Sequence, residues 1–194
     1  VNARGLAALQ RLRHAAAHRI FKRQQTSETK IAVRFAARPE RGQLVLMRGR
    51  LVDGRMTEQR LLFMTQEAGY PGGSRVAVGH DGMLWLTTGA PFGEAAGDLA
   101  SPFGKVLRLN PDGSIPADNP FVGHTNARPE IWSYGHRNPQ GIDFHPTLPF
   151  VMATEHGPDH GDEVNVIERG ANYGWPRIHH RETEVGLRSP ALEF

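Results

Sequence analysis

The stretch from Ile131 to Pro176 reads IWSYGHRNPQGIDFHPTLPFVMATEHGPDHGDEVNVIERGANYGWP, and it holds the features that decide the fold. Short apolar runs of strand length alternate in it with loops rich in glycine, histidine, arginine and carboxylates. A ligand site needs this arrangement, because strands supply rigidity and loops supply polar groups. We therefore expect a β-rich domain with a ligand site at the ends of its strands.

The composition is that of a folded, strand-rich domain. The chain has 194 residues, of which 39% are hydrophobic and 22% are charged, as in globular proteins. Its 22 glycines and 14 prolines favour short strands and tight turns. The absence of cysteine excludes disulfides, thiolate metal sites and a cysteine nucleophile. No apolar run reaches the length of about 18 residues that a membrane span requires, so we expect none.

The first 29 residues differ from the rest, and we predict a basic helical segment over 1–29 followed by a β domain over 30–194. Leucines recur at helical spacing and basic residues far outnumber acids there. Such a helix could bind nucleic acid or an anionic membrane, or could simply pack on the domain. We expect no nucleic-acid partner. Arginines and histidines interrupt any apolar core, so we expect no secretory signal.

Two segments share the order strand, turn, strand. They are Arg75–Gly89 (RVAVGHDGMLWLTTG) and Gly141–Glu155 (GIDFHPTLPFVMATE), which align at a constant offset of 66 residues. Further short strands are predicted at 30–36, 43–50, 59–65, 105–109, 130–134 and 163–167. A repeated antiparallel unit is typical of a β-propeller, and a β-sandwich is the alternative.

Two groups of residues could bind a ligand. Arg137 and Asn138 follow a strand, and a guanidinium there could grip a carboxylate bidentately or could tie down the loop. Acidic residues interrupted by glycines form the second group, whose oxygens suit calcium better than zinc unless the loop is merely solvated. Its members are Glu155, Asp159, Asp162 and Glu163.

The histidines favour no hydrolase. No HExxH motif is present, and the histidines fall on several predicted loops, so solvated or core positions are the plainer interpretation. The sequence also has no GxSxG elbow, no P-loop and no GxGxxG after a strand. The serine hydrolase, P-loop nucleotidase and Rossmann dehydrogenase classes therefore lack support.

Several motifs in register resemble one known family. The runs GHRNPQGIDFHP, ATEHGP, GDEVN and GANYGWP, with GGSRVAVGHDGMLWLTTG and GKVLRLNPDGSIPADNPF upstream, resemble the glucose/sorbosone dehydrogenase family of soluble PQQ-dependent aldose sugar dehydrogenases. The resemblance covers roughly residues 43–176. It implies an all-β fold, a six-bladed β-propeller of the soluble quinoprotein glucose dehydrogenase type, of which this chain holds material for about three blades.

The resemblance also implies an activity and a set of site residues. The family binds pyrroloquinoline quinone (PQQ) and Ca²⁺, and oxidises an aldose sugar at its anomeric hydroxyl to a lactone, usually in the periplasm. Arg137 and Asn138 match the pair that holds the quinone carboxylates, and His179 falls near a cofactor contact. Four residues match calcium ligands of different members, the first two through their carbonyls: Gly157, Pro158, Glu163 and Tyr173.

The chain departs from the family at its acid–base positions. The resemblance places the catalytic histidine at Pro71 and its aspartate partner at Ala90, while the nearest histidine, His80, falls in a predicted turn. Because proline accepts no proton, a non-catalytic binding or scaffold propeller is the alternative function. An incomplete propeller also exposes sheet edges, so we expect a second copy or a partner chain to cover them.

Overall fold

The computed structural model describes residues 29–38, 41–52, 55–66, 72–90, 92–180 and 182–194. Within these ranges it contains strands and one short 3₁₀ helix, η2 (Glu94–Ala96), and no α-helix, so the expected all-β class is confirmed. No helix in the described part is long and apolar enough to cross a membrane. The predicted N-terminal helix lies outside the described residues, and the division at residue 29 stays a prediction.

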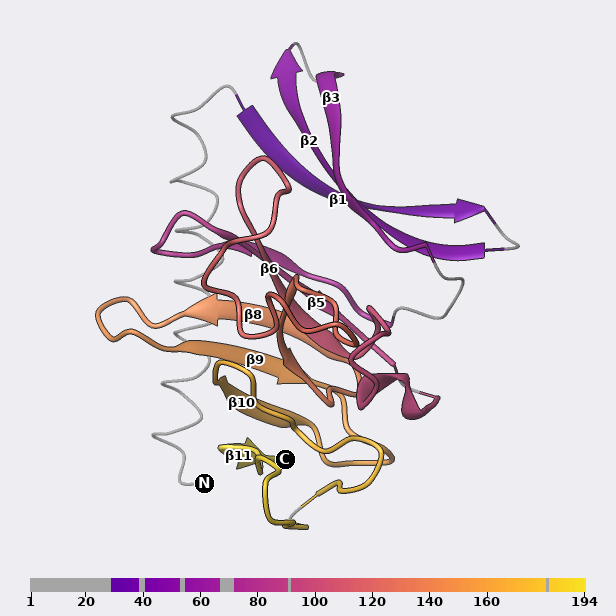
Figure 1. The fold of residues 1–194 in the computed structure, drawn as a ribbon, viewed down its shortest axis with the longest axis vertical. Coiled ribbons are helices and arrows are strands. Elements are labelled where there is room, and N and C mark those ends of the chain that lie inside the picture. The colour runs from indigo at the N-terminus through magenta and orange to yellow at the C-terminus, as the bar shows by residue number, and fades with distance from the viewer. Residues whose placement is uncertain (1–28, 39–40, 53–54, 67–71, 91, 181) are drawn as a thin grey trace. The chain divides into compact units, whose positions relative to one another are not determined.

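The strands form three sheets (Figure 1). Their orders are β1-β2-β3, β4-β5-β6-β7 and β11-β10-β9-β8. The strands are β1 (Thr29–Arg38), β2 (Arg41–Val52), β3 (Arg55–Met64), β4 (Val76–Val78), β5 (Leu84–Thr88), β6 (Lys105–Leu109), β7 (Ile131–Tyr134), β8 (Pro139–Phe144), β9 (Val151–Glu155), β10 (Glu163–Ile167) and β11 (Leu192–Glu193). The chain divides into two units, residues 1–32 with 47–60 and residues 33–46 with 61–194, and the site lies in the second.

The predicted strand–turn–strand repeat is confirmed. Strands β4 and β5 pair antiparallel, and so do β8 and β9, each pair closed by a turn. In the first turn Gly82 has φ +79°, a conformation that glycine adopts without strain. His80 lies in this turn as expected, and its Nε2 is 3.1 Å from the His145 carbonyl in the second turn. The two repeats therefore touch through their turns.

Apolar side chains from both four-stranded sheets form one core. Its buried members are Ala77, Trp85, Val106, Ile142, Val151, Ala153, Ile167 and Tyr173. The Trp85 ring on β5 meets the edge of the Phe144 ring on β8, with centroids 5.6 Å apart. Burial of such side chains stabilises each by about 1.5–3 kcal/mol. The packed sheets thus give a rigid base to the loops that carry the site.

Candidate functional site

The site begins at the turn between β7 and β8. Gly135 has φ +76°, and a Cβ there would lie 2.0 Å from the Asn172 side chain, so only glycine fits. Its N–H donates to the Ala96 carbonyl at 2.8 Å, and the next N–H, of His136, donates to the Gly104 carbonyl at 3.1 Å. These bonds fix the backbone that presents Arg137.

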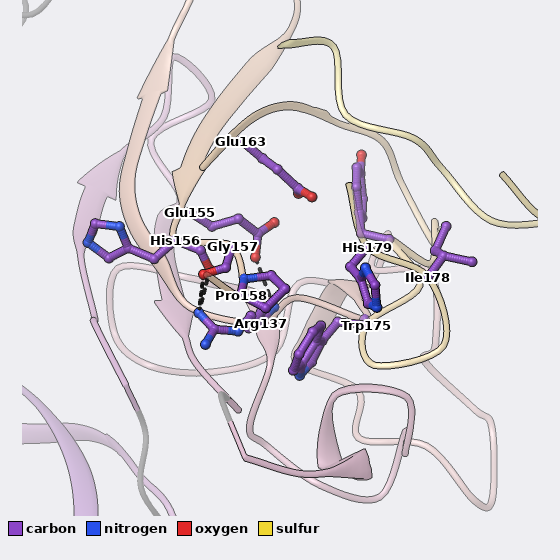
Figure 2. A pocket seen from close by; sticks show the side chains of 11 residues that line it. Arg137, Glu155, His156, Gly157, Pro158, Glu163, Trp175, Ile178 and His179 are labelled. Carbon is purple, nitrogen blue, oxygen red and sulfur yellow. Dashed lines mark hydrogen bonds between the residues drawn. The ribbon is translucent and has the colours of Figure 1, made fainter. Parts of the chain in front are cut away.

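Arg137 lies on the wall of a small pocket that is open to solvent (Figure 2). Its Nη1 donates to the carbonyls of His156 at 2.9 Å and Gly157 at 2.7 Å. Its Nε is buried and has no hydrogen-bond partner among the described residues. Within that part of the chain no carboxylate pairs with the guanidinium. An uncompensated cation with an orphaned donor suits an anionic ligand.

Most of the predicted site residues meet at this pocket. Those that line it are Arg137, Gly157, Pro158, Glu163, Tyr173 and His179. The resemblance assigned no role to Trp175 or Ile178, which also line the pocket, although Trp175 stands within the quoted run GANYGWP. The structure therefore gathers residues from four separate loops and strands around one hollow.

Asn138 is not among the residues that line the pocket. Its Oδ1 accepts a hydrogen bond from the Gly73 N–H at 2.6 Å, and its carbonyl accepts from the His156 N–H at 3.1 Å. Asn138 thereby ties the loop before β4 to the end of β9. Pro71, the expected acid–base position, lies outside the described residues.

Ala90, the second departure from the family pattern, is buried with 6% exposure. It packs in an apolar cluster with Ala96 and Phe103, and Trp175 lies against that cluster. Ala90, at the position where the resemblance places an aspartate, thus lies in an apolar environment.

Three carboxylates face one another across neighbouring strands. Glu163 on β10 is in register with Glu155 on β9 and with Glu193 on β11. Burial and then the nearby Glu155 and Glu193 raise the pKa of Glu163 to about 7, against a lowering by the Asn165 hydrogen bond. Like charges placed opposite each other in a sheet destabilise it, so a cation bound at Glu163 would relieve this repulsion.

A buried polar network fixes Glu155, which the sequence named only as one of several acids. Its Oε1 accepts from Asn165 Nδ2 at 2.6 Å and lies 3.1 Å from His136 Nδ1, while its Oε2 accepts from the Arg137 N–H at 2.9 Å. His136 Nε2 is 2.8 Å from Ser133 Oγ. Ser133 is fully buried, so this serine–histidine–glutamate chain cannot act as a nucleophilic triad. It holds the Arg137 backbone instead.

The expected calcium ligands differ in availability. The Gly157 carbonyl faces the pocket but accepts from Arg137 Nη1, with its second lone pair still available. The Tyr173 hydroxyl donates to the Val166 carbonyl and accepts from the Glu168 N–H, and burial raises the Tyr173 pKa to about 12. A calcium role for Tyr173 would therefore fall to its main-chain carbonyl.

No group of three His, Asp or Glu side chains in the described ranges could hold a metal ion. A cation here would need main-chain carbonyls in addition to Glu163, which is chemistry that calcium accepts and zinc does not favour. His179, the expected cofactor contact, lies on the pocket wall with its ring centroid 6.4 Å from that of Trp175.

The comparison with family models decides the family. Residues 14–190 match the model described as Glucose / Sorbosone dehydrogenase. The chain belongs to this family. Aldose sugar dehydrogenase YliI of Escherichia coli (strain K12) is 41% identical over 134 residues, which cover 66% of this chain and 36% of that protein.

Solved structures of this glucose/sorbosone dehydrogenase family resemble the chain closely. A protein of Thermus thermophilus described as an oxidoreductase (glucose dehydrogenase) is 41% identical with a TM-score of 0.79, covering 86% of this chain and 53% of that one. The PQQ-bound aldose sugar dehydrogenase of Streptomyces coelicolor is 29% identical with a TM-score of 0.74, covering 86% and 49%. The chain thus spans about half of each of these structures.

Proposed function

We propose that this chain takes part in the PQQ- and calcium-dependent oxidation of an aldose sugar at its anomeric hydroxyl to a lactone. The observation that carries the proposal is the Arg137 guanidinium on the pocket wall, with an orphaned Nε and no carboxylate partner among the described residues. PQQ has three carboxylates, which match such a cation. The PQQ-bound relative with the same fold supports this choice of ligand.

The donors that line the pocket suit both cofactors in kind. Arg137 would bind a quinone carboxylate, with His179 on the same pocket wall as a further contact. Asn138, which the resemblance also assigns to the quinone, bonds to Gly73 instead and does not line the pocket. The carbonyls of Gly157 and Pro158, with Glu163, would hold the calcium, and the main chain of Tyr173 would add a ligand. The bound PQQ would supply the acceptor for the hydride of the sugar. The Glu155 carboxylate keeps the Arg137 main chain in place for that contact.

Calorimetric titration of the chain with PQQ, with and without Ca²⁺, tests the proposal. We expect heat of binding and a rise in melting temperature that both depend on calcium, because calcium relieves the repulsion at Glu163. Glu163→Gln should weaken the calcium dependence, and Glu58→Gln, whose side chain is 69% exposed, is the matched control. Absence of both heat and thermal shift would refute the proposal.

A second candidate function is binding without turnover. Ala90 is buried among apolar groups, and Pro71 replaces the histidine that the family uses as base. General base catalysis contributes about 10²–10⁴-fold, so dye-linked sugar oxidation should stay near background. Pro71→His combined with Ala90→Asp should raise it. Robust turnover by the unaltered chain would exclude this candidate.

We further infer that the two four-stranded antiparallel sheets are blades of a six-bladed β-propeller, of which this chain holds about three. Each has the meander order expected of a blade, β4-β5-β6-β7 and β8-β9-β10-β11. A second copy or a partner chain would then cover the sheet edges left open. Sedimentation of the purified chain tests this, because a monodisperse monomer at micromolar concentration would contradict it.

A further inference from the structure

Trp175 is fixed in the pocket wall by two hydrogen bonds. Its indole Nε1–H donates to the Ala90 carbonyl at 2.9 Å, and its main-chain N–H donates to the Gly135 carbonyl at 3.0 Å. Figure 2 shows the indole beside Arg137 and His179. A side chain held at both its main chain and its ring has little freedom left, so it presents a defined flat surface.

Arg137 completes a closed chain of contacts with the same residues. The Ala90 N–H donates to the Arg137 carbonyl at 2.7 Å, and the Arg137 guanidinium carbon lies 5.1 Å from the Trp175 ring centroid. A guanidinium at this distance is attracted by the ring face. Ala90 therefore anchors the arginine through its N–H and the tryptophan through its carbonyl.

The guanidinium divides its donors into two sets. Nη1 is occupied by the carbonyls of His156 and Gly157. Nε and Nη2 make no hydrogen bond within the described residues, and because Nε is buried, Nη2 is the donor that a ligand can reach. The carbonyls and the indole thus hold one end and one face of the guanidinium, and leave Nη2 for a ligand.

We propose that Trp175 is a positioning residue of this pocket, which holds the Arg137 guanidinium so that its Nη2 meets a carboxylate of the bound ligand. The inference rests on the proposed function, since it takes PQQ as the ligand. It adds that the affinity of Arg137 for a carboxylate depends on the uncharged indole of Trp175.

The chain offers a matched control in a second arginine–tryptophan pair. The Arg108 guanidinium carbon lies 5.0 Å from the Trp132 ring centroid, but Trp132 does not line the pocket. Trp132→Phe makes the same chemical change as Trp175→Phe away from the ligand. Trp175→Leu removes the ring face altogether, and circular dichroism and melting temperature show whether each variant folds.

A double-mutant cycle on PQQ affinity in the presence of calcium tests the inference. In the otherwise unaltered chain, Trp175→Leu should weaken binding about 10-fold and Trp175→Phe about 3-fold, because the ring that orients the guanidinium is lost or no longer anchored. In an Arg137→Met background, Trp175→Leu should weaken PQQ binding by less than about twofold. Trp132→Phe should leave affinity within about twofold of the parent.

A second readout needs no ligand. The Nε–H of Arg137, assigned by its loss in Arg137→Lys, should exchange slowly with water in the parent chain and faster in Trp175→Leu. Equal losses of affinity in both backgrounds, or an unchanged exchange rate, would overturn the positioning role while leaving the proposed function intact. A parent chain that binds no PQQ would refute the proposed function and the positioning role together.

Discussion

Arg108 and Arg137 both stack on tryptophan rings, but they differ in their hydrogen-bond partners and counter-ions. The Arg108 side chain is 8% exposed and pairs with Asp81 at 3.0 Å and Asp118 at 2.8 Å. It also donates to the Asn119 side chain at 3.1 Å. Arg137 has two carbonyls and, within the described residues, no carboxylate. One charge is neutralised by the fold and the other is left for a ligand.

This difference separates a structural from a functional arginine. A buried cation is costly unless carboxylates and hydrogen bonds compensate it, as they do at Arg108. At Arg137 the fold tolerates an uncompensated cation in a pocket that is open to water. Residues that lack a counter-ion beside a pocket are thus better candidates for ligand binding than residues that are merely buried and charged.

Arg108→Met should give the largest loss of stability. It leaves Asp81, Asp118 and Asn119 without their donor and removes the cation between Trp85 and Trp132. We expect the free energy of unfolding to fall by about 3 kcal/mol, measured by urea denaturation. A fall of less than about 1 kcal/mol in the free energy of unfolding would show that the Arg108 ion pairs contribute no more than those of an exposed arginine.

Lys105→Met should cost less and change the dependence of stability on pH. Lys105 Nζ donates to the carbonyls of Ala95, Ala96 and Phe103, and burial lowers the Lys105 pKa from 10.5 to about 7. We expect a loss of about 2 kcal/mol from the carbonyls left unpaired.

The sign of the pH effect follows from the lowered pKa. Between pH 7 and 10.5 the unfolded chain binds a proton at Lys105 that the folded chain has released, so stability should rise with pH across that window. Urea denaturation at several pH values should show this rise in the parent chain and in the control Arg169→Met, and no such rise in Lys105→Met. An equal rise in all three chains would contradict it.

Arg137→Met should barely change stability. The carbonyls that it leaves face a pocket that water can enter, so we expect a change of about 1 kcal/mol or less in the free energy of unfolding. A fall of more than about 3 kcal/mol in the same urea experiment would show that Arg137 stabilises the fold as much as Arg108 does.

Asp118→Asn should have the smallest effect. The Asp118 side chain is 71% exposed, so its pair with Arg108 is weakened by water, and Asp81 remains as the second carboxylate. We expect a change of about 0.5 kcal/mol or less. A larger loss would show that both carboxylates are needed to neutralise Arg108.

The sequence predicted the strands of the two four-stranded sheets well, because alternating apolar runs were bounded by Gly, Pro and Asp turns. Residues 105–109, 163–167 and 76–78 are strands as expected. Strand β3 begins before the predicted 59–65, at Arg55, and β11 was missed because Leu192–Glu193 is too short to show a period. β3 extends to Arg55 because it pairs with β2, which directly precedes it, whereas β11 is fixed by pairing with β10, which ends at Ile167, well before it in the chain.

The candidate site was predictable only through its motifs. The chemistry of the residue types named Arg137 and Glu163, the resemblance to the family added Gly157, and all three line one pocket. Spacing alone could not show that Asn138 faces Gly73 or that the Tyr173 hydroxyl is occupied by the main chain of β10. Trp175 was missed because its role depends on contacts with Ala90 and Arg137, which lie far from it in sequence.

The most direct test is the affinity for PQQ, measured by calorimetry with calcium present, of the parent chain, Arg137→Met and Arg177→Met. Arg177 is an exposed arginine paired with Glu184 and serves as the matched control. We predict that Arg137→Met weakens binding about 100-fold while Arg177→Met stays within about twofold of the parent. Equal affinities of all three chains would contradict the claim that the uncompensated charge of Arg137 grips the quinone.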